Sequence, residues 1–267
     1  MSIRIQVDPT NPGQFFACCG LLELADRLWP GAEGWFAEEG FIIRCDGDLR
    51  RLLAILVMDP PEEILQQGGV AVPPLIAPLC FSFDGGASTG LVLDAWMTVR
   101  LNKGQVQAAA QPPWNFWSGQ QTSLRIWKAL REALAGQLMH LDDDQLIALF
   151  SQRQLLAGRF GFDPGAAWNA LDVGFSPNEQ KMAVASSAAV ELLAAVGVQR
   201  FRPLMAADRQ SFEYCTWGAA LGPSVAAAAA TGMVRAAPVT RYRGRVVSRG
   251  SYAALGFSTL LRGGSDE

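Results

Sequence analysis

The sequence contains a single histidine, His140, and its five cysteines never form a C-x-x-C pair. Multi-histidine metal sites and zinc ribbons need several such ligands at short spacing, so we expect neither a metal nor any other cofactor. The glycine-rich stretch DGGASTG at residues 84–90 is not followed by lysine, which excludes the phosphate-binding loop of nucleotide hydrolases. Together these absences favour a protein that is not an enzyme.

Long apolar runs are also missing. No run reaches the roughly 18 residues that a membrane helix requires, and the opening MSIRIQVDPTNPG lacks a basic segment followed by an apolar one. Half of the 267 residues are nevertheless hydrophobic and only 18% are charged, a composition that can bury a core and is too apolar for disorder. We therefore expect a cytoplasmic protein with no membrane partner.

The hydrophobic periodicity predicts an α+β fold, because helices and strands do not alternate with the regular rhythm of a doubly wound sheet. Mixed strands and short helices come first, followed by a helical middle segment at about residues 118–158. A basic, β-rich part follows at about 201–262. We expect residues 1–265 to form a single unit.

Local signals place the individual elements. Asn11 is a favourable N-cap and Pro12 fits the first helical turn, which predicts a helix up to about residue 28. Further helices are expected at 49–58, 118–135, 142–156 and 186–196, the last ending at Gly197. Strands are expected at 3–7, 35–36, 41–45, 79–83 and 91–101 and throughout the region after residue 201.

Two adjacent cysteines, Cys18 and Cys19, lie near the start of the first predicted helix. A helix N-terminus can lower the pKa of a thiol and so create a nucleophile. Helical spacing, however, aligns both cysteines with the apolar stripe that contains Leu21 and Leu22. We predict that they are packing residues.

The stretch RLNKGQVQAAAQPPWNFWSGQQT combines cations, amides and aromatic residues. The tripeptide NKG is typical of a turn, which would present a lysine at a loop tip. Amide and cationic groups can read base edges, whereas tryptophans beside two prolines commonly anchor a loop on a core, and we favour packing for the aromatic residues. The candidate nucleic-acid contacts of this stretch are Arg100, Lys103, Asn115, Gln120 and Gln121.

Charge is distributed unevenly along the chain. Residues 1–213 contain 16 basic and 23 acidic residues, whereas residues 214–265 contain six arginines and no acid. Because strand side chains repeat every two residues, three of these arginines should share one face and suit a phosphate backbone. Salt bridges to acids elsewhere in the chain are the alternative. The candidate residues are Arg235, Arg241, Arg243, Arg245 and Arg249.

Several strings resemble a known family: NPGQFFACCGLLELADRLWPGAEGWF, LDAWMTVRLNKG, WNFWSGQQTS and FGFDPGAAWNALDVGFSPNEQ, followed by ELLAAVGVQRFRP. They are similar to the small, large-subunit-like protein of type I-G (formerly I-U) CRISPR effector complexes. The resemblance implies a subunit without catalytic activity whose partners are the other effector subunits, crRNA, target DNA and a helicase–nuclease. It also implies roles in recognising the motif that flanks the target, in supporting the R-loop and in recruiting the helicase–nuclease for antiviral defence.

Two alternatives remain open from the residues alone. One is a standalone cytoplasmic enzyme that uses Cys18 or Cys19 as a nucleophile. The other is a metal-independent RNA-processing protein that uses the arginine-rich segments and Tyr242.

Overall fold

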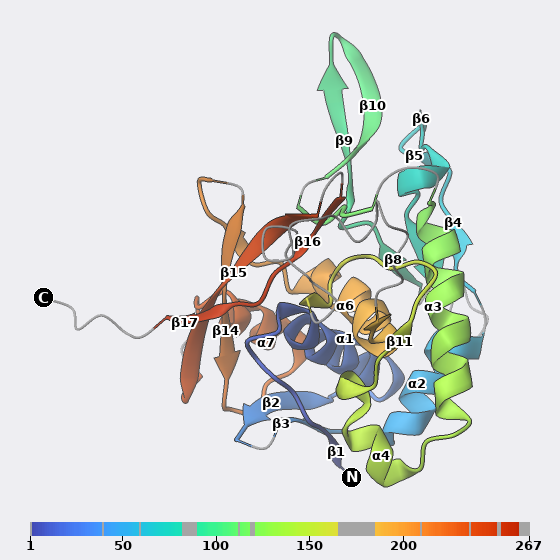
Figure 1. Ribbon diagram of the computed structural model, residues 1–267. Helices are drawn as coiled ribbons and strands as arrows, with labels where there is room; N and C mark the ends of the chain where they lie inside the picture. The colour runs from blue at the N-terminus through green and yellow to red at the C-terminus, as the bar shows by residue number, and fades with distance from the viewer. Residues whose placement is uncertain are drawn as a thin grey trace, which may run out of the picture.

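The computed structural model describes residues 2–38, 40–58, 60–81, 90–111, 113–117, 121–164, 185–208, 210–234, 236–249 and 252–261. Helices and short strands occur in separate parts of the molecule, and every strand pair in these residues is antiparallel (Figure 1). The predicted α+β class is therefore confirmed.

Two helices form the centre of the molecule, α1 (Pro12–Leu28) and α6 (Ala188–Arg200). Both are apolar on nearly every side, as expected of helices that are surrounded by other elements. The Asn11 side chain accepts a hydrogen bond from the Gln14 amide at 3.1 Å, so α1 begins at the predicted cap and has the predicted bounds. A continuous core of buried apolar residues extends around this helix pair from Ile3 to Leu255.

A small sheet and three helices pack beside the centre (Figure 1). The sheet has the order β1-β3-β2, formed by β1 (Ser2–Ile5), β2 (Glu33–Ala37) and β3 (Gly40–Arg44). The helices are α2 (Leu49–Met58), α3 (Ser123–Leu138) and α4 (Asp143–Ile147).

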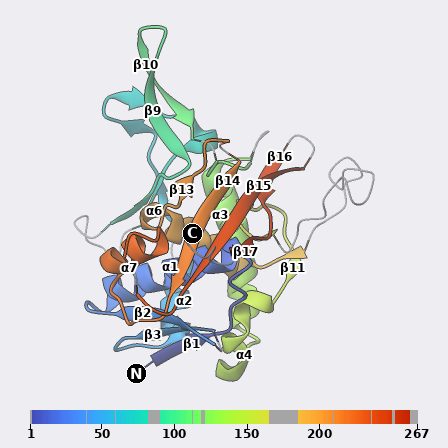
Figure 2. The same ribbon diagram turned by 90° about the vertical axis from the view of Figure 1, so that its left-hand side faces the viewer.

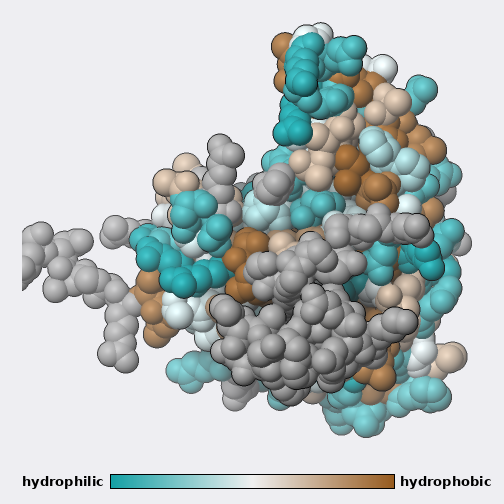
Figure 3. All heavy atoms as spheres, turned by 45° about the horizontal axis from the view of Figure 1, so that its top comes forward, coloured by the Kyte–Doolittle hydropathy of each residue, from teal (hydrophilic) through white to brown (hydrophobic). Residues whose placement is uncertain are grey.

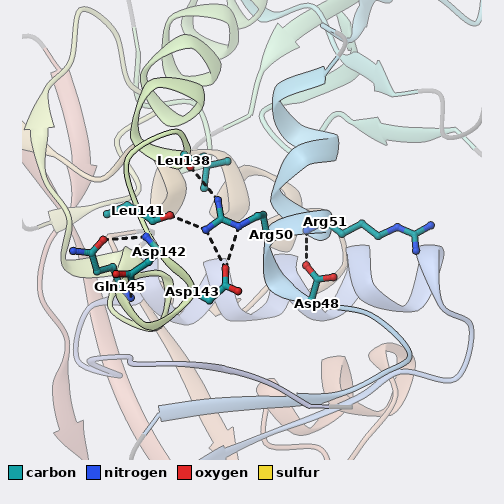
Figure 4. A network of polar contacts seen from close by, with 8 residues as sticks. All are labelled: Asp48, Arg50, Arg51, Leu138, Leu141, Asp142, Asp143 and Gln145. Atoms are coloured by element: carbon teal, nitrogen blue, oxygen red, sulfur yellow. Dashed lines mark hydrogen bonds and ion pairs between the residues drawn. The ribbon is translucent and has the colours of Figure 1, made fainter.

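Arg50 of α2 ties these helices together. Its guanidinium donates to the carbonyl oxygens of Leu138 and Leu141 at 3.0 and 2.7 Å and pairs with Asp143 at 3.0 Å (Figure 4). A carbonyl at the end of α3 and one just beyond it thus receive donors, which helps to satisfy the helix C-terminus. Asp142 caps α4 in a capping box with Gln145, so the acidic run has a structural role in starting this helix.

The C-terminal part is a twisted sheet that wraps one side of the centre (Figures 1 and 2). Its order is β13-β14-β15-β16, with β17 also paired to β15. The strands are β13 (Leu204–Met205), β14 (Ser211–Trp217), β15 (Val239–Arg249), β16 (Tyr252–Leu255) and β17 (Thr259–Leu261), and helix α7 (Pro223–Ala230) connects β14 to β15.

Short strands form the remaining part. The hairpin of β9 (Met97–Asn102) and β10 (Gln105–Ala110) projects from the body (Figures 1 and 2). The other elements are β4 (Glu62–Glu63), β5 (Gln66–Gln67), β6 (Val70–Ala71), η1 (Pro74–Ile76), β7 (Leu79–Phe81), β8 (Leu91–Leu93), η2 (Leu149–Ser151), β11 (Gln154–Leu155) and β12 (Ala185–Ser186).

Three local expectations need correction, and two elements were not predicted. The helix expected at 142–156 ends at Ile147, and the helix expected to stop at Gly197 continues to Arg200. The strand expected at 91–101 is interrupted between β8 and β9, where the backbone amides of Asp94 and Ala95 donate to the Gln199 side chain instead of a neighbouring strand. Strand β10 and helix α7 were not expected at all.

No helix in the described part of the chain is both long and apolar enough to cross a membrane.

Candidate nucleic-acid interface

The projecting hairpin presents Lys103 at its tip. Strands β9 and β10 pair over six residues, and the two connecting residues, Lys103 and Gly104, have φ angles of 50° and 79°. Two consecutive left-handed residues form a type I′ turn, whose twist matches that of the flanking strands. The sequence-based placement of Lys103 at an exposed turn is confirmed.

The two faces of the hairpin differ in chemistry. Residues directly opposite one another share a face, so Val99, Leu101 and Val106 lie on one side, with 41%, 71% and 57% of their surfaces exposed. Arg100 lies opposite Gln107 on the other side. No carboxylate among the described residues pairs with Arg100 or Lys103. In Figure 3 the projecting end shows hydrophilic atoms beside hydrophobic ones.

The base of the hairpin is anchored to α6. The Gln199 side-chain oxygen accepts hydrogen bonds from the Asp94 and Ala95 amides, both at 2.9 Å. Arg202, just beyond the end of α6, pairs with Asp94 at 3.3 Å. The orientation of the hairpin is therefore set by the central helix.

The aromatic residues after the hairpin pack in the core, as we favoured. Trp114, Phe116 and Trp117 are 3%, 3% and 6% exposed, and the Trp117 indole donates to the Leu75 carbonyl oxygen at 2.8 Å. The rings are thus unavailable for stacking on bases.

The structure separates the polar candidates of this stretch. Lys103 lies six residue steps from Met97 at the hairpin base, or roughly 20 Å at the usual rise of a strand. Asn115 is half-buried between the core aromatics, and its side-chain nitrogen is buried without a hydrogen-bond partner. Gln121 donates to the Ala157 carbonyl oxygen at 3.5 Å, while Gln120 lies outside the described residues. Arg100 and Lys103 therefore stay together on the hairpin, away from Asn115 and Gln121.

The second candidate surface is the outer face of β15. Tyr242 and Gly244 are buried, and the three arginines that alternate with them point outward, which confirms the predicted shared face. We call Arg241, Arg243 and Arg245 the outer arginine row. Arg235 lies outside the described residues, and of Arg249 only the backbone, at the end of β15, is described.

A carboxylate on the neighbouring strand contacts this row. Glu213 of β14 lies opposite Arg243 in the ladder, and its Oε1 accepts two hydrogen bonds from Arg243, from Nε at 3.1 Å and from Nη2 at 2.5 Å. Arg241 Nη1 lies 4.0 Å from the other oxygen. All three side chains remain 37–56% exposed. The expected alternative, a salt bridge to an acidic neighbour, is therefore present at two of the three arginines.

Arg245 is placed differently. In the ladder it lies opposite Ser211 rather than a carboxylate. Its charge acts on Asp208, whose pKa is held below its ordinary value by hydrogen bonds from Gln210 and Ser211, with Arg245 adding a smaller effect. Arg245 therefore retains more of its free charge than Arg243.

The inner face of β15, beneath the outer arginine row, is firmly packed. There, the rings of Tyr242 and Tyr214 stack with centroids 5.4 Å apart, and the Tyr214 hydroxyl donates to the Pro9 carbonyl oxygen at 2.6 Å. Burial raises the pKa of both tyrosines. Neither phenol is suited to act as a general base or to stack on a base from outside.

The cysteines of α1 are packing residues, as predicted. Cys18 and Cys19 are fully buried, and loss of hydration raises the pKa of each thiol well above its ordinary value. A catalytic cysteine needs partial exposure and a lowered pKa. The structure provides neither condition at this position.

Sequence reasoning missed a buried carboxylate pair, Glu191 and Asp163. Glu191 accepts hydrogen bonds from the amides of Gly161, Phe162 and Asp163 at 2.9, 3.3 and 3.0 Å. Asp163 in turn accepts from the Asn11 side chain at 3.0 Å. The only signal was a single charged residue inside the apolar string AAVELLAAVGV.

This pair has a structural role, since it attaches the loop before residue 164 to both central helices. In the part of the chain that the structure describes, no three histidine, cysteine, aspartate or glutamate side chains are grouped so that they could hold a metal ion. Comparisons of the chain with protein-family models, curated proteins and solved structures gave no match.

Proposed function

We propose that this chain is a non-catalytic subunit of a type I-G CRISPR surveillance complex and that it contacts nucleic acid through the outer arginine row. The family resemblance of its sequence suggests the complex, and the exposed row supports the contact. Its partners are then the other effector subunits, crRNA, target DNA and the helicase–nuclease, all in the cytoplasm.

The geometry of the row is the observation that carries the proposal. Alternate residues of a strand lie about 6.6–6.8 Å apart, so three guanidinium groups follow one another along a single line. Guanidinium donors bind phosphate in a forked, charge-assisted geometry. Because the stacked tyrosines hold β15 from below, the line is preorganised. Such a surface suits a sugar–phosphate backbone and carries no base specificity of its own.

The hairpin supplies the groups that suit recognition of the flanking motif. Arg100 and Gln107 lie opposite one another on its polar face, and Lys103 extends from its tip. Guanidinium and amide groups can each make bidentate contacts with base edges in a major groove. Since α6 fixes the hairpin base, these groups are held on a defined support.

The two alternatives receive less support. A thiol enzyme would have to use cysteines whose burial raises their pKa, which opposes nucleophilic reactivity. An RNA-processing protein that relies on Tyr242 would use a buried phenol with a raised pKa.

The test is to neutralise the row in the assembled complex. The triple variant Arg241→Gln, Arg243→Gln, Arg245→Gln should assemble with its guide RNA, bind target DNA more weakly and show a weaker salt dependence of that binding. Each lost phosphate contact lowers the slope of log K against log salt by about 0.9. The control is Arg125→Gln with Lys128→Gln, which removes two exposed charges from α3 and should leave binding unchanged. Unchanged affinity and slope in the triple variant would contradict the proposal.

A further inference from the structure

The outer arginine row is partly occupied by the protein itself. Glu213 is the only charged residue of β14, and its carboxylate takes the Nε and Nη2 donors of Arg243. A phosphate can accept from the same pair of donors in a forked geometry. The other oxygen of Glu213 faces Arg241 at 4.0 Å. Glu213 therefore holds the position that a backbone phosphate would take on this row.

The contact is not needed to hold the two strands together. Strands β14 and β15 pair over seven consecutive residues, and their inner faces are buried by aromatic side chains. The Glu213 side chain is 37% exposed and that of Arg243 49% exposed. Exposed ion pairs contribute little to stability because water and salt screen them. Because this ion pair adds little to stability, another anion can replace the Glu213 carboxylate on the arginine row.

We propose that Glu213 is a built-in competitor for the phosphate backbone, which pairs with Arg243 in the free protein, partly screens Arg241, and is displaced when nucleic acid binds. This inference rests on the proposed function of the row. Glu213 sets selectivity by suppressing binding to arbitrary nucleic acid. The row engages fully only where the assembled complex places a backbone against it. Arg245, which lacks this contact, makes the first encounter.

The experiment uses the isolated full-length chain and a short, mixed-sequence DNA duplex carrying a fluorophore. Anisotropy titrations at several salt concentrations give the affinity and its salt slope. Glu213→Gln keeps the shape of the side chain and removes its charge. It should tighten binding by at least about threefold, because the carboxylate no longer competes with the phosphate for Arg243 and an exposed ion pair contributes about this much. The slope should steepen by about 0.9, because one more arginine becomes available.

Two matched variants isolate the effect. Glu62→Gln removes an exposed charge from β4 and so changes the net charge equally, and it should leave affinity and slope at the wild-type values. Adding Glu213→Gln to Arg243→Gln should give little of the gain, because the competitor acts through Arg243. The thermal midpoint of Glu213→Gln should stay close to that of the wild type.

Three results would overturn the inference. One is a gain no larger than that of Glu62→Gln, another is an equal gain in the Arg243→Gln background, and the third is a markedly lower thermal midpoint, which would make the ion pair structural. If the triple arginine variant weakens the complex as proposed, these results reject the competitor role alone. If neither the wild type nor Glu213→Gln binds the duplex and the triple variant leaves the complex unaffected, the proposed function of the row fails as well.

Discussion

The central helix pair and the projecting hairpin differ in how they are stabilised and in how much of their surface is exposed. Between α1 and α6 the backbones nearly touch: a Cβ added at Gly197 would lie 2.0 Å from the Phe16 carbonyl oxygen, and one at Gly20 would lie 2.0 Å from that of Leu193. The hairpin is held by its own ladder and leaves Leu101 71% exposed. The stability of the fold should therefore depend mainly on the helix pair. Contacts with other molecules should instead involve the exposed strands.

The largest expected effect on stability is at the glycine crossing, by which we mean the close contact of α1 with α6 at Gly20 and Gly197. Gly197→Ala should lower the free energy of unfolding by about 3 kcal/mol or more, because the added methyl meets backbone atoms that cannot move independently. Urea unfolding measures it. Gly136→Ala on α3 is the control: nothing lies within 4 Å of its added Cβ, so the helix should gain about 0.5–1 kcal/mol. A Gly197 variant as stable as the wild type would show that the helices are not packed through this contact.

The next largest effect on stability is expected at Glu191, the buried carboxylate of α6. Glu191→Gln should cost about 1–3 kcal/mol, since an amide nitrogen replaces one of the two oxygens that accept backbone N–H groups. Burial raises the pKa of Glu191, the charge of Asp163 adds to this rise, and backbone hydrogen bonds and Arg159 oppose it.

A raised pKa makes this residue most stabilising at low pH. Its contribution should be complete below the ordinary glutamate pKa and should fall as pH rises through the raised value. The stability gap between the wild type and Glu191→Gln should thus narrow from acid to neutral pH in urea titrations. A gap that widens with pH would mean that the folded protein favours the ionised carboxylate.

A smaller effect on stability is expected at Cys18 and Cys19, whose small side chains are fully buried in the core. Cys18→Ala and Cys19→Ala should each cost about 1–2 kcal/mol for lost burial and leave nucleic-acid binding intact. In native protein both thiols should react with a labelling reagent far more slowly than Cys80, which is partly exposed. Fast labelling of either residue would indicate a reactive thiol and support the thiol-enzyme alternative. Loss of nucleic-acid binding in a stably folded variant would contradict the packing role.

The smallest effect on stability is expected at the hairpin tip. Lys103→Gly should change the free energy of unfolding by less than about 0.5 kcal/mol or raise it, because glycine adopts a positive φ without strain. If Lys103 contacts DNA, the same variant should still reduce binding of target DNA by the complex. Lys128→Gln, which removes an exposed charge from α3, is the control. A tip variant that binds as well as the control would confine recognition to the arginine row.

Local chemistry in the sequence was sufficient for some elements. Asn11 and Pro12 defined the start of α1, and the apolar stripe placed Cys18 and Cys19 inside. Alternation along β15 placed its arginines on one face, because the strand period depends only on the backbone. Pro at the first turn of α7 was a comparable local signal that went unused.

Other features depend on contacts between distant residues. Gly197 resembles a helix stop in the sequence, but it lies inside α6 because Phe16 approaches there. The alanine-rich β10 has weak strand preference, and its ladder with β9 overrides that preference. Glu213 and Arg243 are 30 residues apart, so only the pairing of β14 with β15 reveals that the basic row includes an acid.

The glycine crossing also has an evolutionary consequence. A side chain at Gly20 or Gly197 would force the two helices apart, and one at Gly13 would meet the Phe162 carbonyl oxygen at 2.3 Å. Descendants that retain these close backbone contacts must therefore keep glycine at all three positions. Three spaced glycines with a capping asparagine thus form a signature by which divergent relatives can be identified after the surface has lost all similarity.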